Sequence, residues 1–213
     1  MARSVLRSLP FLALLAATAC TSGPAPGDDS AYIKQIEDFR AGKDQQFGQL
    51  PDCGSSDVDC SPVPGDKRQT LVPLKYFPVD PLQSVPASLK LADDRPVYEM
   101  PTSTGKLRRM QLVGSLNFSL NGQAMSLGAF VEDGTTTIDT LFVPFADLTT
   151  GAETYAAGRY LDLHPTSTGY YMVDFNRAYN PYCAYNSTYD CPYPPPSNRL
   201  KVAVRAGEKV PGA

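Results

Sequence analysis

Polar and charged side chains gather in the last third of the sequence, where loops are expected to leave a β-sheet. Asp174, Asn176 and Arg177 come at the end of an apolar run, and Asn180 precedes Pro181. Loops at the rim of a sheet often carry functional groups, and a guanidinium can bind a carboxylate or phosphate through two parallel hydrogen bonds. The pattern therefore predicts a pocket for a small anionic or sugar-like ligand. Its candidate residues are Glu153, Arg159, Asp174, Asn176, Arg177, Asn180 and Glu208.

The same residue types fit two other interpretations. In the first, aspartate and arginine form a buried ion pair and the asparagines cap turns of a long loop, so that the cluster is structural. In the second, carboxylates near Asp174 and Glu153 serve a hydrolase that acts on an envelope substrate. Glycoside hydrolysis, for example, needs two carboxylates about 5 to 10 Å apart. Separation along the chain does not decide between these alternatives.

Four cysteines, Cys53, Cys60, Cys183 and Cys191, form an even set, which favours disulfides in an oxidising compartment. Three connectivities are possible, and local pairing of 53 with 60 and of 183 with 191 needs only short loops. Structural zinc sites place about two to four residues between paired cysteines, whereas six and seven residues separate these pairs. His164 is the only histidine. We therefore expect disulfides and no metal.

The N-terminus has the features of an export signal. Positive charge precedes the mostly apolar run Leu9–Ala19, which is shorter than the roughly 20 residues of a membrane-spanning helix. Cys20 follows small residues and resembles the lipidated cysteine of a bacterial lipobox, although cleavage without lipidation also fits. We expect a signal peptide (1–19) and a flexible tether that starts at the lipidated cysteine (20–30). The anchor would hold the domain at the cell envelope, on the outer membrane of a Gram-negative cell, in the periplasm or at the surface.

The charge of the chain argues against nucleic acid as a partner. The formal net charge is −3, and removal of the signal peptide with Arg3 and Arg7 makes it −5. The sequence contains no glycine-rich nucleotide-binding fingerprint and no nucleophile elbow. We therefore expect no cofactor, and the partners expected are the membrane, through Cys20, and a small polar ligand or an envelope protein.

One helix and a series of short strands are predicted for the exported part. Apolar residues at helical spacing predict a helix over 30–46, within a segment (31–68) that ends in a cysteine-clipped loop. Alternating apolar residues then predict a β-rich domain over 69–213, from a first strand at 71–77 to a last strand at 200–205, with a hairpin that turns at Asn121-Gly122. The expected fold is mainly β, an antiparallel sandwich or barrel-like sheet with one N-terminal helix.

Two stretches resemble motifs of a bacterial family of unknown function, DUF1684. The first is Ala146-Asp147-Leu-Thr-Thr-Gly-Ala-Glu-Thr-Tyr-Ala-Ala-Gly-Arg-Tyr-Leu-Asp-Leu163. The second begins with Asp174-Phe-Asn-Arg-Ala-Tyr-Asn-Pro-Tyr-Cys-Ala-Tyr-Asn186 and ends with Ala206-Gly-Glu-Lys209. The resemblance covers roughly residues 70 to 210 and implies a shared fold but no known activity. We thus expect a non-catalytic ligand-binding or structural module, with the envelope hydrolase as the alternative.

Overall fold

The computed structural model describes residues 29–53 and 59–212. The predicted signal peptide, Cys20 and nearly all of the tether lie outside these residues. Within the described ranges the elements are α1 (Ser30–Gln49), α2 (Arg68–Leu71), β1 (Ser84–Leu91), β2 (Val97–Pro101), β3 (Leu107–Leu120), β4 (Gln123–Glu132), β5 (Leu141–Phe145), β6 (Arg159–Leu163) and β7 (Tyr171–Asp174). Single 3₁₀ turns lie at Gly65–Lys67, Pro81–Gln83, Phe175–Arg177, Tyr182–Ala184 and Pro196–Asn198.

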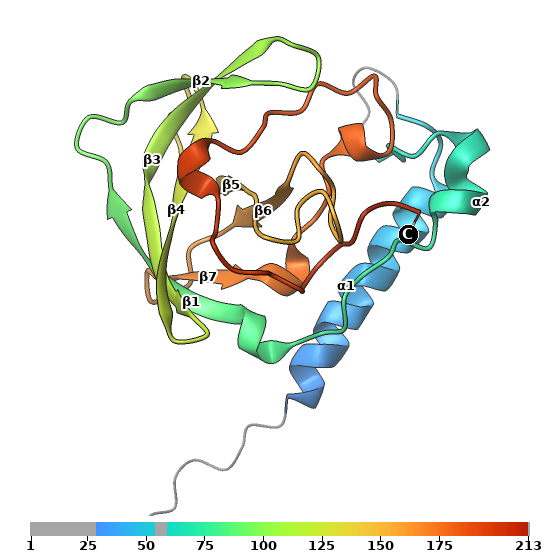
Figure 1. Cartoon of the computed structure of the whole chain (residues 1–213), viewed down its shortest axis with the longest axis horizontal. Helices are drawn as coiled ribbons and strands as arrows, with labels where there is room; N and C mark the ends of the chain where they lie inside the picture. Colours follow the sequence, from blue (N-terminus) through green and yellow to red (C-terminus); the bar gives the residue numbers. More distant parts are fainter. Residues whose placement is uncertain (1–28, 54–58, 213) are drawn as a thin grey trace, which may run out of the picture.

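The seven strands of the described residues form one antiparallel sheet that curves until it nearly closes (Figure 1). The strand order is β6-β5-β4-β3-β1-β7, and β2 pairs with β3 beside this path. A bridge between Pro165 and Tyr171 links the two ends of the order, β6 and β7. Antiparallel pairing that closes on itself leaves few unpaired strand edges. The prediction of a mainly β fold with a barrel-like sheet is confirmed.

The β3–β4 hairpin follows from its turn residues. Asn121 and Gly122 connect the strands with φ angles of 51° and 75°, and Leu120 pairs with Gln123 across them. Positive φ at both central turn positions is typical of the tight turns that match the twist of a hairpin, and an Asn-Gly dipeptide tolerates it. The hairpin expected from this dipeptide is therefore present.

Strands β5 and β6 bury side chains on both faces. Leu141, Val143 and Phe145 belong to the main core together with Leu161 and residues of β3, β4 and β7. The alternate residues of the same strands pack into smaller clusters on the opposite face. Because successive side chains of a strand point to opposite faces, this end of the sheet needs a cover on its second side. That cover positions the site described below.

Helix α1 is three residues longer than predicted. It runs from Ser30 to Gln49, and its buried residues are Ile36 and Phe47. Phe39, on the same helix, is 39% exposed. The guanidinium of Arg177 lies over the Phe39 ring, 4.8 Å from its centroid.

Neither the first nor the last predicted strand forms. The segment 71–77 begins as the end of α2, and its Tyr76 makes only a single bridge to Glu208. The segment 200–205 lies against the core without pairing as a strand. Its carbonyl oxygens accept from separate donors: the N–H of Leu148 donates to Val202 at 3.0 Å, and Arg159 donates to Val204 (2.8 Å) and, just beyond the segment, to Ala206.

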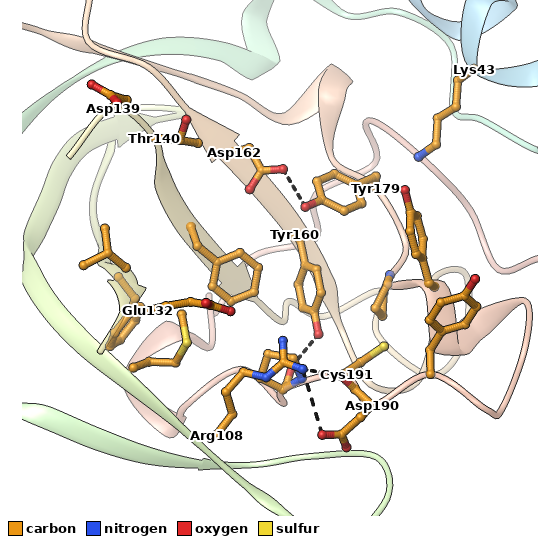
Figure 2. A pocket seen from close by; sticks show the side chains of 18 of the residues that line it. Lys43, Arg108, Glu132, Asp139, Thr140, Tyr160, Asp162, Tyr179, Asp190 and Cys191 are labelled. Carbon is orange, nitrogen blue, oxygen red and sulfur yellow. Dashed lines mark hydrogen bonds and ion pairs between the residues drawn. The ribbon is translucent and has the colours of Figure 1, made fainter. Parts of the chain in front are cut away.

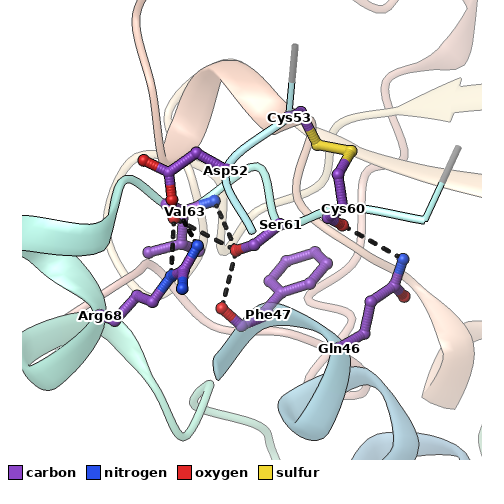
Figure 3. Close-up of a disulfide and its surroundings, with 8 residues drawn as sticks. All are labelled: Gln46, Phe47, Asp52, Cys53, Cys60, Ser61, Val63 and Arg68. Carbon is purple, nitrogen blue, oxygen red and sulfur yellow. Dashed lines mark hydrogen bonds and ion pairs between the residues drawn. A yellow bond between two sulfur atoms is a disulfide. The ribbon is translucent and has the colours of Figure 1, made fainter. Parts of the chain in front are cut away.

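The loop that follows α1 contains the disulfide Cys53–Cys60 (Figure 3). Next to it, the Ser61 hydroxyl donates to the carbonyl oxygen of Phe47 at 2.7 Å. The loop is thus fastened to the end of α1 as well as to itself, and this expected disulfide is present.

Among the residues that the structure describes, no helix has the length and apolar character needed to cross a membrane.

Candidate functional site

A pocket of about 1150 Å³ lies between the second face of the sheet, helix α1 and the loop 179–192 (Figure 2). This volume is just above the usual range of small-molecule sites, about 300–1,000 Å³. The strands β3 to β6 supply one wall, and the connection 135–140 supplies part of the rim. The pocket combines a ligand-sized volume with aromatic and charged lining residues, which makes it the candidate binding site.

The pairing of the strands puts aromatic and acidic side chains on this wall. Phe130 pairs with Phe142, and Phe142 pairs with Asp162, so the three side chains lie in one row on one face. Tyr160 and Glu132 stand two residues from members of this row and share the same face. All five line the pocket.

The aromatic rings of the wall meet edge to face. The Phe142 and Tyr160 ring centroids are 4.7 Å apart at an interplanar angle of 76°, and the Tyr160 and Tyr179 rings are 5.7 Å apart at 90°. The Tyr160 hydroxyl donates to the carbonyl oxygen of Pro192 at 2.5 Å, which holds the loop against the sheet. Burial raises the pKa of the Tyr160 and Tyr179 phenols, so both stay neutral.

Acidic side chains outnumber basic ones around the pocket. The charged residues that line it are Asp38, Glu132, Asp139, Asp162 and Asp190 on the acidic side, and Lys43 and Arg108 on the basic side. Lys43 forms an ion pair with Glu208 at 2.5 Å, and Arg108 lies 3.9 Å from the carboxylate of Asp190. The Tyr179 hydroxyl donates to Asp162 at 2.6 Å (Figure 2).

Two thiols pack beside Tyr160 of this aromatic wall, and one of them, Cys191, lines the pocket. Cys183 and Cys191 are both buried and both free, so the structure does not contain the second disulfide that was predicted. The backbone N–H of Cys183 donates to the sulfur of Cys191 at 3.1 Å, and the Tyr155 hydroxyl approaches the Cys183 sulfur at 3.9 Å. The hydrogen bond from Cys191 lowers the pKa of Cys183. The 3₁₀ turn at Tyr182–Ala184 thus brings the thiols together without joining them.

Within residues 29–53 and 59–212, no three histidine, cysteine, aspartate or glutamate side chains lie close enough together to hold a metal ion. The polar groups of the pocket are instead arranged as separate carboxylates around aromatic rings.

None of the seven predicted pocket residues, all of which the structure describes, lines this pocket. Arg159 is 1% exposed and lies between the sheet and the C-terminal segment. Its guanidinium forms an ion pair with Asp147 at 2.9 Å and donates to the carbonyl oxygens of Val204 and Ala206. These contacts hold the C-terminal segment in place.

Glu208 and Asn180 join the C-terminal segment to the loop and to α1. The buried carboxylate of Glu208 accepts hydrogen bonds from the backbone N–H of Asn180 and from the Tyr185 hydroxyl, both at 2.7 Å, in addition to its ion pair with Lys43. The Asn180 amide donates to the carbonyl oxygen of Lys209 at 2.7 Å. Every one of these contacts connects two segments that lie far apart in the sequence.

Asp174, Asn176 and Arg177 form a third cluster, at the end of β7. Asp174 accepts a hydrogen bond from Tyr32 of α1 at 2.7 Å and caps the 3₁₀ turn through the N–H of Asn176 at 3.1 Å. Arg177 lies 3.4 Å from the same carboxylate. The Asn176 side chain bonds both the N–H and the carbonyl of Asp80, at 3.0 and 2.8 Å. The cluster thus fastens α1 and the segment before β1.

Glu153 is separate from all three clusters. It forms an ion pair with Arg205 at 2.8 Å, which lowers the pKa of the Glu153 carboxylate. Asp174 and Glu153, the carboxylates considered for hydrolysis, therefore belong to different clusters, and each has an arginine partner.

Sequence reasoning did not identify the pocket residues. The available signal was the strand 141–145, whose residues are apolar at every position. A strand that is apolar on both faces is covered on both faces. The pocket lies between this strand and the α1 helix and loop 179–192 that cover its second face.

Two of three comparisons with known proteins found a match. A search of curated proteins found no match. The solution NMR structure of an uncharacterised protein from Haloarcula marismortui is similar, with a TM-score of 0.64 and 36% sequence identity over 85% of this chain and 96% of that one. Residues 69–209 match the family described as protein of unknown function, DUF1684. The chain belongs to the DUF1684 family.

Proposed function

We propose that this protein is an exported, lipid-anchored component of the bacterial cell envelope that binds a small ligand without transforming it. The pocket beside Phe142 and Tyr160 carries the proposal: it has the size of a ligand site, a rigid aromatic wall and a charged rim. Its carboxylates are distributed around the rim, and the clusters named for catalysis are taken up by structural hydrogen bonds.

Two observations support export and anchoring. The disulfide Cys53–Cys60 fits an oxidising compartment. Cys20 follows a signal-like segment and is separated from α1 by only a short, Pro- and Gly-rich stretch. A domain anchored in this way would stay close to the membrane while its pocket samples ligands in the surrounding compartment.

Lipidation at Cys20 predicts that Cys20→Ser loses the anchor. Bacterial cells that express the protein and are fed an alkyne-bearing palmitate should label the wild-type protein and not the variant, and the variant should leave the membrane fraction. Cys53→Ser is the control, because it removes a cysteine and keeps the label. Equal labelling of wild type and Cys20→Ser would contradict the anchor.

Occupation of the pocket by a ligand predicts that Gly42→Trp blocks binding. A Cβ at Gly42 meets nothing within 4 Å, and this position of α1 lines the pocket, so the indole would enter it. A saturation-transfer NMR screen of small metabolites against the purified protein should give ligands whose signals disappear in Gly42→Trp. They should persist in the matched variant Ala41→Trp, whose side chain lies on α1 outside the pocket. A screen without any ligand sensitive to Gly42→Trp would overturn the proposed function.

A further inference from the structure

We propose that the ligand of this pocket is a small organic cation, an amine or quaternary ammonium compound held between aromatic rings and carboxylates. This inference rests on the proposed function and names its ligand class. It follows from the charge balance of the pocket, from the state of each charged group and from the placement of the rings.

The basic groups of the pocket are already neutralised. The side chain of Lys43 is 13% exposed, and its ammonium bonds Glu208. Arg108 donates to the carbonyl oxygen of Asp190 at 3.0 Å and lies near the carboxylate of the same residue. An anionic ligand would have to compete with these internal partners.

Three carboxylates of the pocket lack a cationic partner among the residues that the structure describes. Glu132 and Asp139 are exposed at the rim, and neither carboxylate has a hydrogen bond or ion pair with a described residue. The carboxylate of Asp162 accepts one hydrogen bond, from the neutral hydroxyl of Tyr179. Their combined field attracts positive charge into the concave space.

A ring and a carboxylate lie side by side on the wall. Phe142 pairs directly with Asp162 across β5 and β6, which places their Cβ atoms about 4.5–5.5 Å apart. Tyr160 stands beside both and meets Phe142 edge to face. A cation here would contact the negative face of a ring and the carboxylate at the same time, and such ring–cation contacts strengthen when water is excluded.

The protein already binds one of its own ammonium groups in this way. Lys43 Nζ lies 4.9 Å from the centroid of the Tyr179 ring and 5.1 Å from that of Phe47, while Glu208 takes its charge. The neighbouring pair of Phe142 with Asp162 repeats the combination of ring and carboxylate without an internal cation among the described residues. Charge and ring geometry therefore favour the same class of ligand.

The test uses three probes of one shape and different charge: choline, the neutral 3,3-dimethyl-1-butanol and the anionic 3,3-dimethylbutanoate. Isothermal titration of the purified protein at low ionic strength should show choline binding at least tenfold more tightly than the alcohol, and the butanoate binding most weakly. Asp162→Asn should weaken choline at least fivefold and leave the alcohol unchanged. Asp94→Asn, an exposed charge change outside the pocket, should leave all three unchanged.

Equal binding of choline and the alcohol, tighter binding of the butanoate, or no choline binding would overturn the cation inference. The proposed function would survive each of these results if the metabolite screen yields any ligand blocked by Gly42→Trp. A screen in which Gly42→Trp blocks no ligand would instead overturn the proposed function itself. Because Asp162 is exposed, its replacement by asparagine is expected to fold and to keep the test decisive.

Discussion

Replacing Arg159 by leucine is expected to lower the free energy of unfolding by about 3–5 kcal/mol. The guanidinium is buried, and so is the carboxylate of Asp147 with which it forms an ion pair. It also donates hydrogen bonds to the carbonyl oxygens of Val204 and Ala206. Burial lowers the pKa of Arg159, while its ion pair and hydrogen bond with Asp147 oppose that change. Leucine would leave a buried carboxylate without its cation and the carbonyls without donors, which costs more than the pair itself contributes.

Urea unfolding followed by far-UV circular dichroism measures the effect, since the chain contains no tryptophan. Arg109→Leu is the matched control, because Arg109 also pairs with an aspartate, Asp133, but its side chain is 62% exposed. That exposed pair is worth at most about 1 kcal/mol. The double variant Arg159→Leu with Asp147→Leu should recover part of the loss, because it removes the orphaned charge. A loss at Arg159 no larger than that at Arg109 would contradict the assigned role.

Replacing Gly207 by alanine is expected to cost about 2–5 kcal/mol, from the left-handed backbone and from overpacking together. Gly207 has a φ of 75°, and a Cβ there would lie 2.5 Å from the carbonyl oxygen of Ala178 and 2.6 Å from that of Phe175. Both obstacles are backbone atoms, so no side-chain rotation relieves the clash. The Phe77 N–H bonds the Gly207 carbonyl at 3.0 Å, which resists a shift of the segment.

Gly42→Ala is the contrasting variant for this experiment. Gly42 lies in the middle of α1, and a Cβ there meets nothing within 4 Å. Alanine should raise the free energy of unfolding by about 0.5–1 kcal/mol, because it lowers the entropy of the unfolded chain and favours the helix. The two glycine-to-alanine changes should therefore have opposite signs in the same urea titration. A neutral result at Gly207 would show that the C-terminal segment can move away from β7.

The sequence was sufficient to predict the elements whose structure is decided locally. The Asn121–Gly122 turn, the alternation of the long hairpin and the N-terminal helix depend on neighbouring residues, and the structure contains all three. The segment 200–205 has the composition of a strand but does not form one. Its Val204 carbonyl accepts from Arg159 and its Val202 carbonyl from the N–H of Leu148, both more than 40 residues away, and no local pattern reveals such donors.

The candidate site depended even more on distant contacts. Asp174, Asn180 and Glu208 were predicted to form a pocket because of their residue types. In the structure they hold loops and α1 together. Those that line the pocket, such as Asp162 and Phe142, are ordinary strand residues in the sequence. Only the register of β5 against β6 places them side by side.

The ion pair between Lys43 and Glu208 spans 165 positions and joins the first helix to nearly the last residues of the chain. During synthesis Lys43 therefore emerges long before Glu208, so α1 lacks its charge partner while the intervening residues are made. Contacts between such distant residues form slowly because a long loop must close first. Docking of α1 through this ion pair is therefore expected to be a late step of folding, because both ends of the long intervening segment must meet first.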